Sequence, residues 1–127
     1  MRKGVYNKIT GRCGEDFAEK FLVKNKYKVI ERNHRNKMGE IDIIAKKGED
    51  LVFVEVKTRS TSDFGTPAEA VTYYKKRSFV NAAKWYLMQN PCDMNIRFDI
   101  IEVFGRFTGD SFDFESINHI EQAFTEV

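Results

Sequence analysis

An acid and a base stand two residues apart in an apolar, strand-like segment of this sequence. Residues 51–59 are rich in β-branched and aromatic side chains, which is typical of a strand in the covered part of a sheet. Successive side chains on a strand point to opposite faces, so we expect Glu55 and Lys57 on one face, about 6–7 Å apart along the backbone. Burying a charge costs free energy unless it is paired or bound to a metal. The pair therefore marks a candidate site.

A second acid strengthens that assignment. Residues 39–45 form another apolar segment with Asp42 near its start, and residues 47–50 read as a turn. We predict an antiparallel hairpin centred on the middle of that turn, which places Asp42 opposite Glu55 at about 4.5–5.5 Å. Two carboxylates that close repel each other unless they share a proton or a cation. Oxygen ligands at this spacing suit Mg²⁺.

The alternative is an ordinary cross-strand ion pair between Lys57 and one acid. For an isolated acid–base pair on a strand this structural interpretation is the more common one. The combination of Asp42, Glu55 and Lys57, in that order and spacing, favours a functional site instead.

The order of an acid, a hairpin turn and then Glu-x-Lys resembles the PD-(D/E)xK nuclease motif. Other stretches extend the match: Gly14-Glu15-x-x-Ala18, Arg32-Asn33-x-Arg35, Gly39-Glu40-Ile41-Asp42, Phe53-Val54-Glu55-Val56-Lys57-Thr58-Arg59, Phe64-Gly65-x-Pro67-x-Glu69-Ala70-Val71 and Arg97-Phe98-Asp99. Together they resemble the YraN-type family of small bacterial proteins with a restriction-endonuclease-like fold. The likeness runs from about Gly11 to Val103.

The resemblance implies a metal site. In the nucleases that this sequence resembles, an acid of the first helix completes the ligand set, and Glu15 matches that position. Asp42, Glu55 and the backbone carbonyl of Val56 would then be further ligands of Mg²⁺ or Mn²⁺. From its residue type alone, Glu15 is more simply a solvated acid near a helix N-terminus.

The resemblance also implies contacts to a phosphate backbone. Lys57 would orient or deprotonate the attacking water, and Arg59 and Lys75 would grip flanking phosphates. A surface salt bridge is the alternative for Arg59. The nearest analogy is to Holliday-junction resolvases, which implies a homodimer presenting two sites to branched DNA.

Composition sets the broad class. A chain of 127 residues with 42% hydrophobic and 31% charged residues is ordinary for a single globular domain spanning residues 1–127. No run approaches the ~20 apolar residues that span a bilayer, and no signal peptide is visible, so we expect a cytoplasmic protein with no membrane partner. Cys13 and Cys92 lack metal-ligand spacing, and we expect both to be reduced thiols.

Charge is unevenly distributed along the chain. Residues 1–106 carry all 21 basic side chains and 14 of the 19 acidic ones, whereas residues 107–127 carry five acids and no Lys or Arg. A basic body is compatible with binding a phosphate backbone and gives mild support to a nucleic-acid partner.

The elements that must position these residues follow from periodicity. We expect helices over 10–26 and from a capping box at Thr66-Pro67-Ala68-Glu69 to about Gln89, and strands over 27–35, 39–46, 51–59, 95–104 and 111–119. Gly105 and Gly109 are expected to bracket a turn. The order α-β-β-β-α-β-β predicts an α/β fold with a mixed sheet of about five strands, flanked by helices, with residues 111–119 at an edge.

Other polar and aromatic residues receive structural interpretations. Glu40 is expected at an exposed strand start, His34 at the surface, and Arg97 and Asp99 in a structural ion pair. His119 suggests no function. Tyr73 and Tyr74 lie beside Lys75 and could stack on bases, but aromatic residues on a helix are more often packed.

Three hypotheses follow. The favoured one is a metal-dependent nuclease that hydrolyses phosphodiester bonds of structured or branched DNA. The alternative is a non-catalytic nucleic-acid-binding module or repair-associated scaffold, and the third is a plain structural domain. Metal binding, DNA binding and turnover separate the three.

Overall fold

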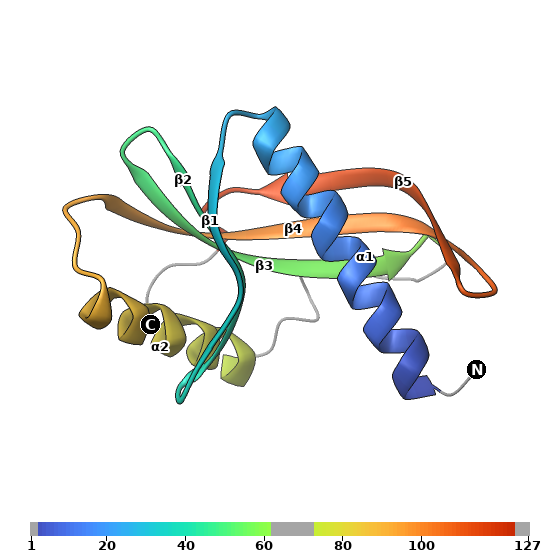
Figure 1. The fold of residues 1–127 in the computed structure, drawn as a ribbon, viewed down its shortest axis with the longest axis horizontal. Coiled ribbons are helices and arrows are strands. Elements are labelled where there is room, and N and C mark those ends of the chain that lie inside the picture. The colour runs from blue at the N-terminus through green and yellow to red at the C-terminus, as the bar shows by residue number, and fades with distance from the viewer. Residues whose placement is uncertain (1–2, 62–72, 124–127) are drawn as a thin grey trace.

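A computed structural model describes residues 3–61 and 73–123 of the chain (Figure 1). Its elements in chain order are α1 (Lys3–Lys24), β1 (Lys28–Asn36), β2 (Gly39–Lys47), β3 (Asp50–Ser60), α2 (Tyr73–Gln89), β4 (Asn95–Thr108) and β5 (Ser111–Ile120). The predicted order of elements is confirmed.

The strands form one mixed five-stranded sheet in the order β1-β2-β3-β4-β5. Pairing is antiparallel throughout except between β3 and β4, which run parallel and are joined through α2. A parallel pair needs a crossover connection, and α2 belongs to it. The fold is therefore α/β with a mixed sheet, as predicted, and β5 lies at an edge.

The β2–β3 hairpin fixes the register on which the site depends. Gly48 has a φ of 59°, the conformation that the first central residue of a tight two-residue turn requires. The observed partners include Lys47 with Asp50 and Ile43 with Val54. This is the predicted register.

Most strand boundaries agree with expectation to within one residue, and larger differences occur in α1 and β4. Helix α1 begins at Lys3 and ends at Lys24, because Lys26 takes a left-handed φ of 72° and the chain then turns into β1. Strand β4 continues to Thr108, so Gly105 lies inside a strand, where an added Cβ would come within 2.3 Å of a ring carbon of Phe112. The prediction that Gly105 starts a turn was wrong. The capping box at 66–69 lies outside the described residues.

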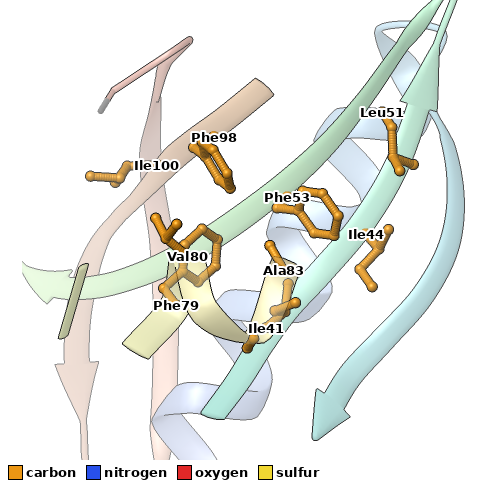
Figure 2. Packing of buried hydrophobic residues seen from close by; sticks show 10 residues of the cluster. Ile41, Ile44, Leu51, Phe53, Phe79, Val80, Ala83, Phe98 and Ile100 are labelled. Atoms are coloured by element: carbon orange, nitrogen blue, oxygen red, sulfur yellow. The ribbon is translucent and has the colours of Figure 1, made fainter. Parts of the chain in front are cut away.

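Each face of the sheet carries its own core. Helix α1 packs through Ala18 and Leu22 on a cluster that includes Val52 and Val54 of β3. Helix α2 packs on the other cluster, in which Figure 2 shows Phe79, Val80 and Ala83 of α2 near Phe53 of β3. Side chains alternate along β3, so Glu55 and Lys57 continue the face of Phe53, toward α2.

Candidate active site

A pocket opens where β2 and β3 separate. Their backbone pairing ends at Ile43 and Val54, although β2 begins four residues earlier and β3 continues to Ser60. The cavity has a volume of about 550 Å³. It is lined by Glu15, Gly39, Glu40, Asp42, Glu55, Val56, Lys57, Thr58, Arg59, Lys75, Ser78 and Phe79. All of the site residues predicted from the sequence therefore line one cavity.

Asp42 occupies the point of separation. Its side-chain Oδ2 accepts a hydrogen bond of 2.8 Å from the backbone N–H of Val56, in place of the strand pairing that ends one residue away. Burial raises the pKa of Asp42 to about 7, and the negative charges of Glu55 and Glu15 add to that rise. A carboxyl with this pKa is half protonated near neutral pH, and a positive charge placed beside it would ionise it.

Glu55 is held by two ammonium groups. Its Oε1 lies 3.3 Å from Nζ of Lys57 and 3.2 Å from Nζ of Lys75. The side chains of Glu55 and Lys57 are both only 10% exposed, whereas that of Lys75 on α2 is 49% exposed. The predicted face-sharing of Glu55 and Lys57 is confirmed, and Lys75 joins them from the helix above.

The two lysines differ in how firmly they keep their protons. Burial lowers the pKa of Lys57, and the hydrogen bond and positive charge of Lys75 lower it further. Burial opposes charge on Lys75 as well, but its hydrogen bond to Lys57 and the negative charge of Glu55 raise its pKa. The pKa values of the two lysines therefore shift in opposite directions, and Nζ of Lys57 is a better proton acceptor than Nζ of Lys75.

Glu15 reaches the pocket from the opposite layer. A Cβ on Gly14 would lie 1.7 Å from Oγ1 of Thr58, so the glycine permits the close approach of α1 to β3. Arg32 of β1 contacts Glu15 at 3.5 Å, and burial raises the pKa of Glu15 against the opposing effect of Arg32. Glu15 of α1 and Lys75 of α2 thus meet where the pairing of β2 and β3 has ended.

The donor set fits a hard divalent cation. Asp42 and Glu55 offer carboxylate oxygens, and the like charge that raises the Asp42 pKa is the repulsion that a bound cation relieves. Glu15 supplies a further carboxylate at the pocket wall. Within residues 3–61 and 73–123 there is no preformed cluster of three or more Asp, Glu, His or Cys side chains able to hold a metal. Assembly of such a set around Asp42 needs side-chain movement by Glu15 or Glu55.

Sequence reasoning missed several roles. Arg32 forms ion pairs with Asp16 at 2.8 Å and Glu19 at 2.9 Å in addition to its contact with Glu15, which anchors β1 to α1. The sequence signal was three acids, Glu15, Asp16 and Glu19, on one face of the first helix, since residues three and four apart are neighbours on a helix. His34 is half-buried, pairs with Glu31 and packs on a tyrosine ring, so its assignment to the surface was wrong.

Other assignments are confirmed or corrected by exposure. Glu40 is 59% exposed and pairs with Arg35, as expected for a strand start. Cys92 is a free, exposed thiol, and the side chain of Cys13 lies outside the described part of the chain. Tyr74 was expected to pack, yet it is 81% exposed.

The fold and the pocket define an α/β protein with a mixed sheet and a polar cavity at a strand separation. The sequence pattern of the uncharacterised protein family UPF0102 matches residues 14–103. The chain belongs to this family, the YraN family. No described helix has the length and apolar character needed to cross a membrane.

Relatives in several bacteria match over nearly their whole length. A UPF0102 protein of Clostridium perfringens is 46% identical over 94% of this chain and 96% of its own. UPF0102 protein GSU0650 of Geobacter sulfurreducens is 45% identical over 94% of this chain and 91% of its own. The corresponding protein of Clostridium beijerinckii is 42% identical over 93% and 94%.

Proposed function

We propose that this protein is a metal-dependent nuclease that hydrolyses phosphodiester bonds in structured or branched DNA. The observation that carries the proposal is the meeting of Asp42, Glu55, Lys57 and Lys75 in one cavity, drawn from β2, β3 and α2. Two carboxylates that repel each other lie beside two lysines whose pKa values shift in opposite directions. This combination suits a reaction in which negative charge is bound and a proton is moved.

Phosphodiester hydrolysis requires an activated water and stabilisation of the charge that develops on the phosphate. A divalent cation, Mg²⁺ or Mn²⁺, supplies charge neutralisation when it is bound. Asp42 and Glu55 would hold it, with Glu15 and the carbonyl oxygen of Val56 as further oxygen donors. Nζ of Lys57 would accept a proton from the attacking water.

The remaining cations of the pocket would hold the substrate. Lys75 keeps its proton and lies at the cavity mouth with half of its side chain exposed, which suits contact with a phosphate. Arg59 lines the same cavity two residues beyond Lys57 on β3. Lys75 and Arg59 would contact the phosphate backbone of the DNA and not the base edges, so recognition would depend on DNA shape more than on sequence.

The test is cleavage of a four-way junction, a flap and a linear duplex in Mg²⁺ and in Mn²⁺. We expect Glu55→Gln and Lys57→Met to lose at least about 100-fold in rate, as removal of transition-state contacts commonly does. Glu40→Gln is the matched control, because it makes the same change at the rim of the same cavity. Cleavage by Glu55→Gln at the wild-type rate would overturn the proposal.

One observation favours a second candidate, a non-catalytic nucleic-acid-binding module. The two ammonium groups beside Glu55 already balance its charge. In that case the pocket would bind phosphate through Lys57 and Lys75 with no need of a cation. Binding of junction DNA in EDTA, with no turnover in either metal, would support the module over the enzyme.

A further inference from the structure

Tyr74 lies beside residues that line the pocket and is largely exposed to solvent. It lies in the first turn of α2, immediately before Lys75, and is 81% exposed. Its neighbours Lys75, Ser78 and Phe79 line the cavity. Residues four positions apart on a helix share a side of it, and Tyr74 is four residues before Ser78, which lines the cavity, so Tyr74 lies on the side of α2 that borders the cavity mouth.

The turn between β1 and β2 packs on the same side of α2, farther along the helix (Figure 1). Ser78 donates a hydrogen bond of 3.1 Å to the carbonyl of Met38, and Asn36 donates one of 3.1 Å to the carbonyl of Ala82. Farther along the helix, Nζ of Lys37 lies 4.7 Å from the ring centre of Trp85. Tyr74 precedes Ser78 by one turn and therefore lies past the end of this cover.

We propose that Tyr74 stacks on an unpaired nucleobase beside the pocket, so the substrate class is DNA with unpaired nucleotides next to the cleaved phosphate. This inference rests on the proposed function and narrows it. An exposed ring is a platform for any base, because every base has a stacking face, and such contacts are sequence-tolerant. In a continuous duplex the base faces are covered by their neighbours, so an unpaired base is what the ring selects.

Charge around the ring favours this occupant. Lys75 and Arg77 follow Tyr74 at one and three positions along the helix, and residues three apart are neighbours on a helix surface. An aromatic ring with adjacent cations is the combination that single-strand binding sites use for base and backbone. Lys75 links the ring to the cavity, because its Nζ lies 3.2 Å from Glu55. A phosphate on Lys75 therefore leaves its nucleobase within reach of Tyr74.

The experiment measures binding in EDTA, so that its result does not depend on cleavage. The probes are a fluorescein-labelled single-stranded 12-mer and a blunt duplex of the same sequence, titrated with the full chain. The variants are Tyr74→Ala and Tyr74→Phe, and Met88→Ala is the matched control, since Met88 is 71% exposed at the other end of α2.

We expect Tyr74→Ala to bind the single strand about fivefold to 100-fold more weakly, with the duplex changed less than about twofold. Tyr74→Phe and Met88→Ala should bind as the wild type does. A single strand carrying 2-aminopurine should be quenched by the wild type and Tyr74→Phe but not by Tyr74→Ala.

Equal weakening of both probes, an unchanged single strand with Tyr74→Ala, or no binding of either probe by the wild type would overturn the inference. A change of oligomeric state in Tyr74→Ala would also overturn it, because the ring would then contact a second copy of the chain and not a nucleobase. Failure of the nuclease proposal would instead appear as undiminished cleavage by Glu55→Gln, whatever Tyr74 does.

Discussion

Two charged clusters are buried on this sheet, and they differ in how completely they are satisfied. Asp99 on β4 is fully buried, and it accepts hydrogen bonds from Arg97 at 2.9 Å and 3.0 Å, from His119 at 2.7 Å and from the backbone of Gln122 at 3.0 Å. Burial alone would raise the pKa of Asp99, but these donors outweigh it and lower the pKa. This cluster stabilises the fold, and we call Asp99 and its donors Arg97, His119 and Gln122 the Asp99 brace.

The pocket cluster is the opposite case. The pKa of Asp42 is raised to about 7, because burial and the charge of Glu55 outweigh its hydrogen bond from Val56. Folding gains little from such an arrangement, which suits a site whose partner arrives from outside. Burial of a charge therefore does not by itself mark a candidate site, whereas an unfavourable balance of like charges in an open cavity does.

The largest effect is expected in the brace. Asp99→Ala leaves the Arg97 guanidinium buried without its main partner, and breaking a buried pair costs about 3–5 kcal/mol. Urea denaturation should show this loss of unfolding free energy. The cleavage rate per folded molecule should stay near the wild-type rate. An Asp99→Ala variant that is stable but inactive would show that Asp99 belongs to the functional site.

Asp42→Asn should raise the free energy of unfolding, whereas Asp99→Ala should lower it. A folded pKa raised from 3.8 to about 7 means that the folded state binds the proton more tightly, so wild-type stability falls as pH rises across that window. Expressed as free energy, the whole pKa shift of Asp42 corresponds to about 4 kcal/mol. Because Asp42 keeps partial access to water, we expect Asp42→Asn to raise the free energy of unfolding by on the order of 2 kcal/mol at pH 8.

The measurement is urea denaturation of wild type and Asp42→Asn in EDTA at pH 5 and pH 8. The gain should be larger at pH 8, and the exposed control Glu40→Gln should change stability by less than about 1 kcal/mol at either pH. Destabilisation by Asp42→Asn at pH 8 would show that the pocket is a second brace.

The position of α1 against the pocket is open to a smaller test. Gly14→Ala places a Cβ 1.7 Å from Thr58 Oγ1, and overpacking of this kind outweighs the roughly 1 kcal/mol that alanine adds to a helix. We expect a net loss of about 1–2 kcal/mol by thermal denaturation. Thr58→Ala in the same chain should restore most of it, and equal losses in both variants would contradict the contact.

The smallest effect concerns one donor of the brace. His119→Phe keeps a ring near Phe21 and Tyr27 but removes the nitrogen 2.7 Å from Asp99. The other donors to Asp99 remain, so we expect a loss of about 1 kcal/mol in urea. No loss, or a loss as large as that of Asp99→Ala, would mean that the brace is not shared among its donors.

The residues of the pocket could be predicted from the sequence better than the contacts around Asp99 could. The turn at Gly48 and the two-residue period of a strand are local, and together they determine the register, which is observed as far as Ile43 and Val54, the residues next to Asp42 and Glu55. The predicted pairing of Asp42 opposite Glu55 itself is absent, because the two strands separate at this point. The face shared by Glu55 and Lys57 follows from the same period. Lys75 matched only through family resemblance, because its contact with Glu55 depends on the path of the crossover.

The brace was only half predictable. Arg97 and Asp99 are two residues apart, and their pairing was expected. The approach of His119 depends on β5 pairing back onto β4, which no local pattern specifies. Exposure of Tyr74 was missed for a similar reason, since the end of the β1–β2 cover on α2 is set by tertiary contacts.

The most direct measurement is anomalous diffraction from wild-type crystals grown with Mn²⁺ near pH 7.5. We expect an anomalous peak between the carboxylates of Asp42 and Glu55, and no such peak in Asp42→Asn crystals grown in the same way. Manganese bound elsewhere on the chain, with Asp42 and Glu55 left as an empty pair, would contradict it.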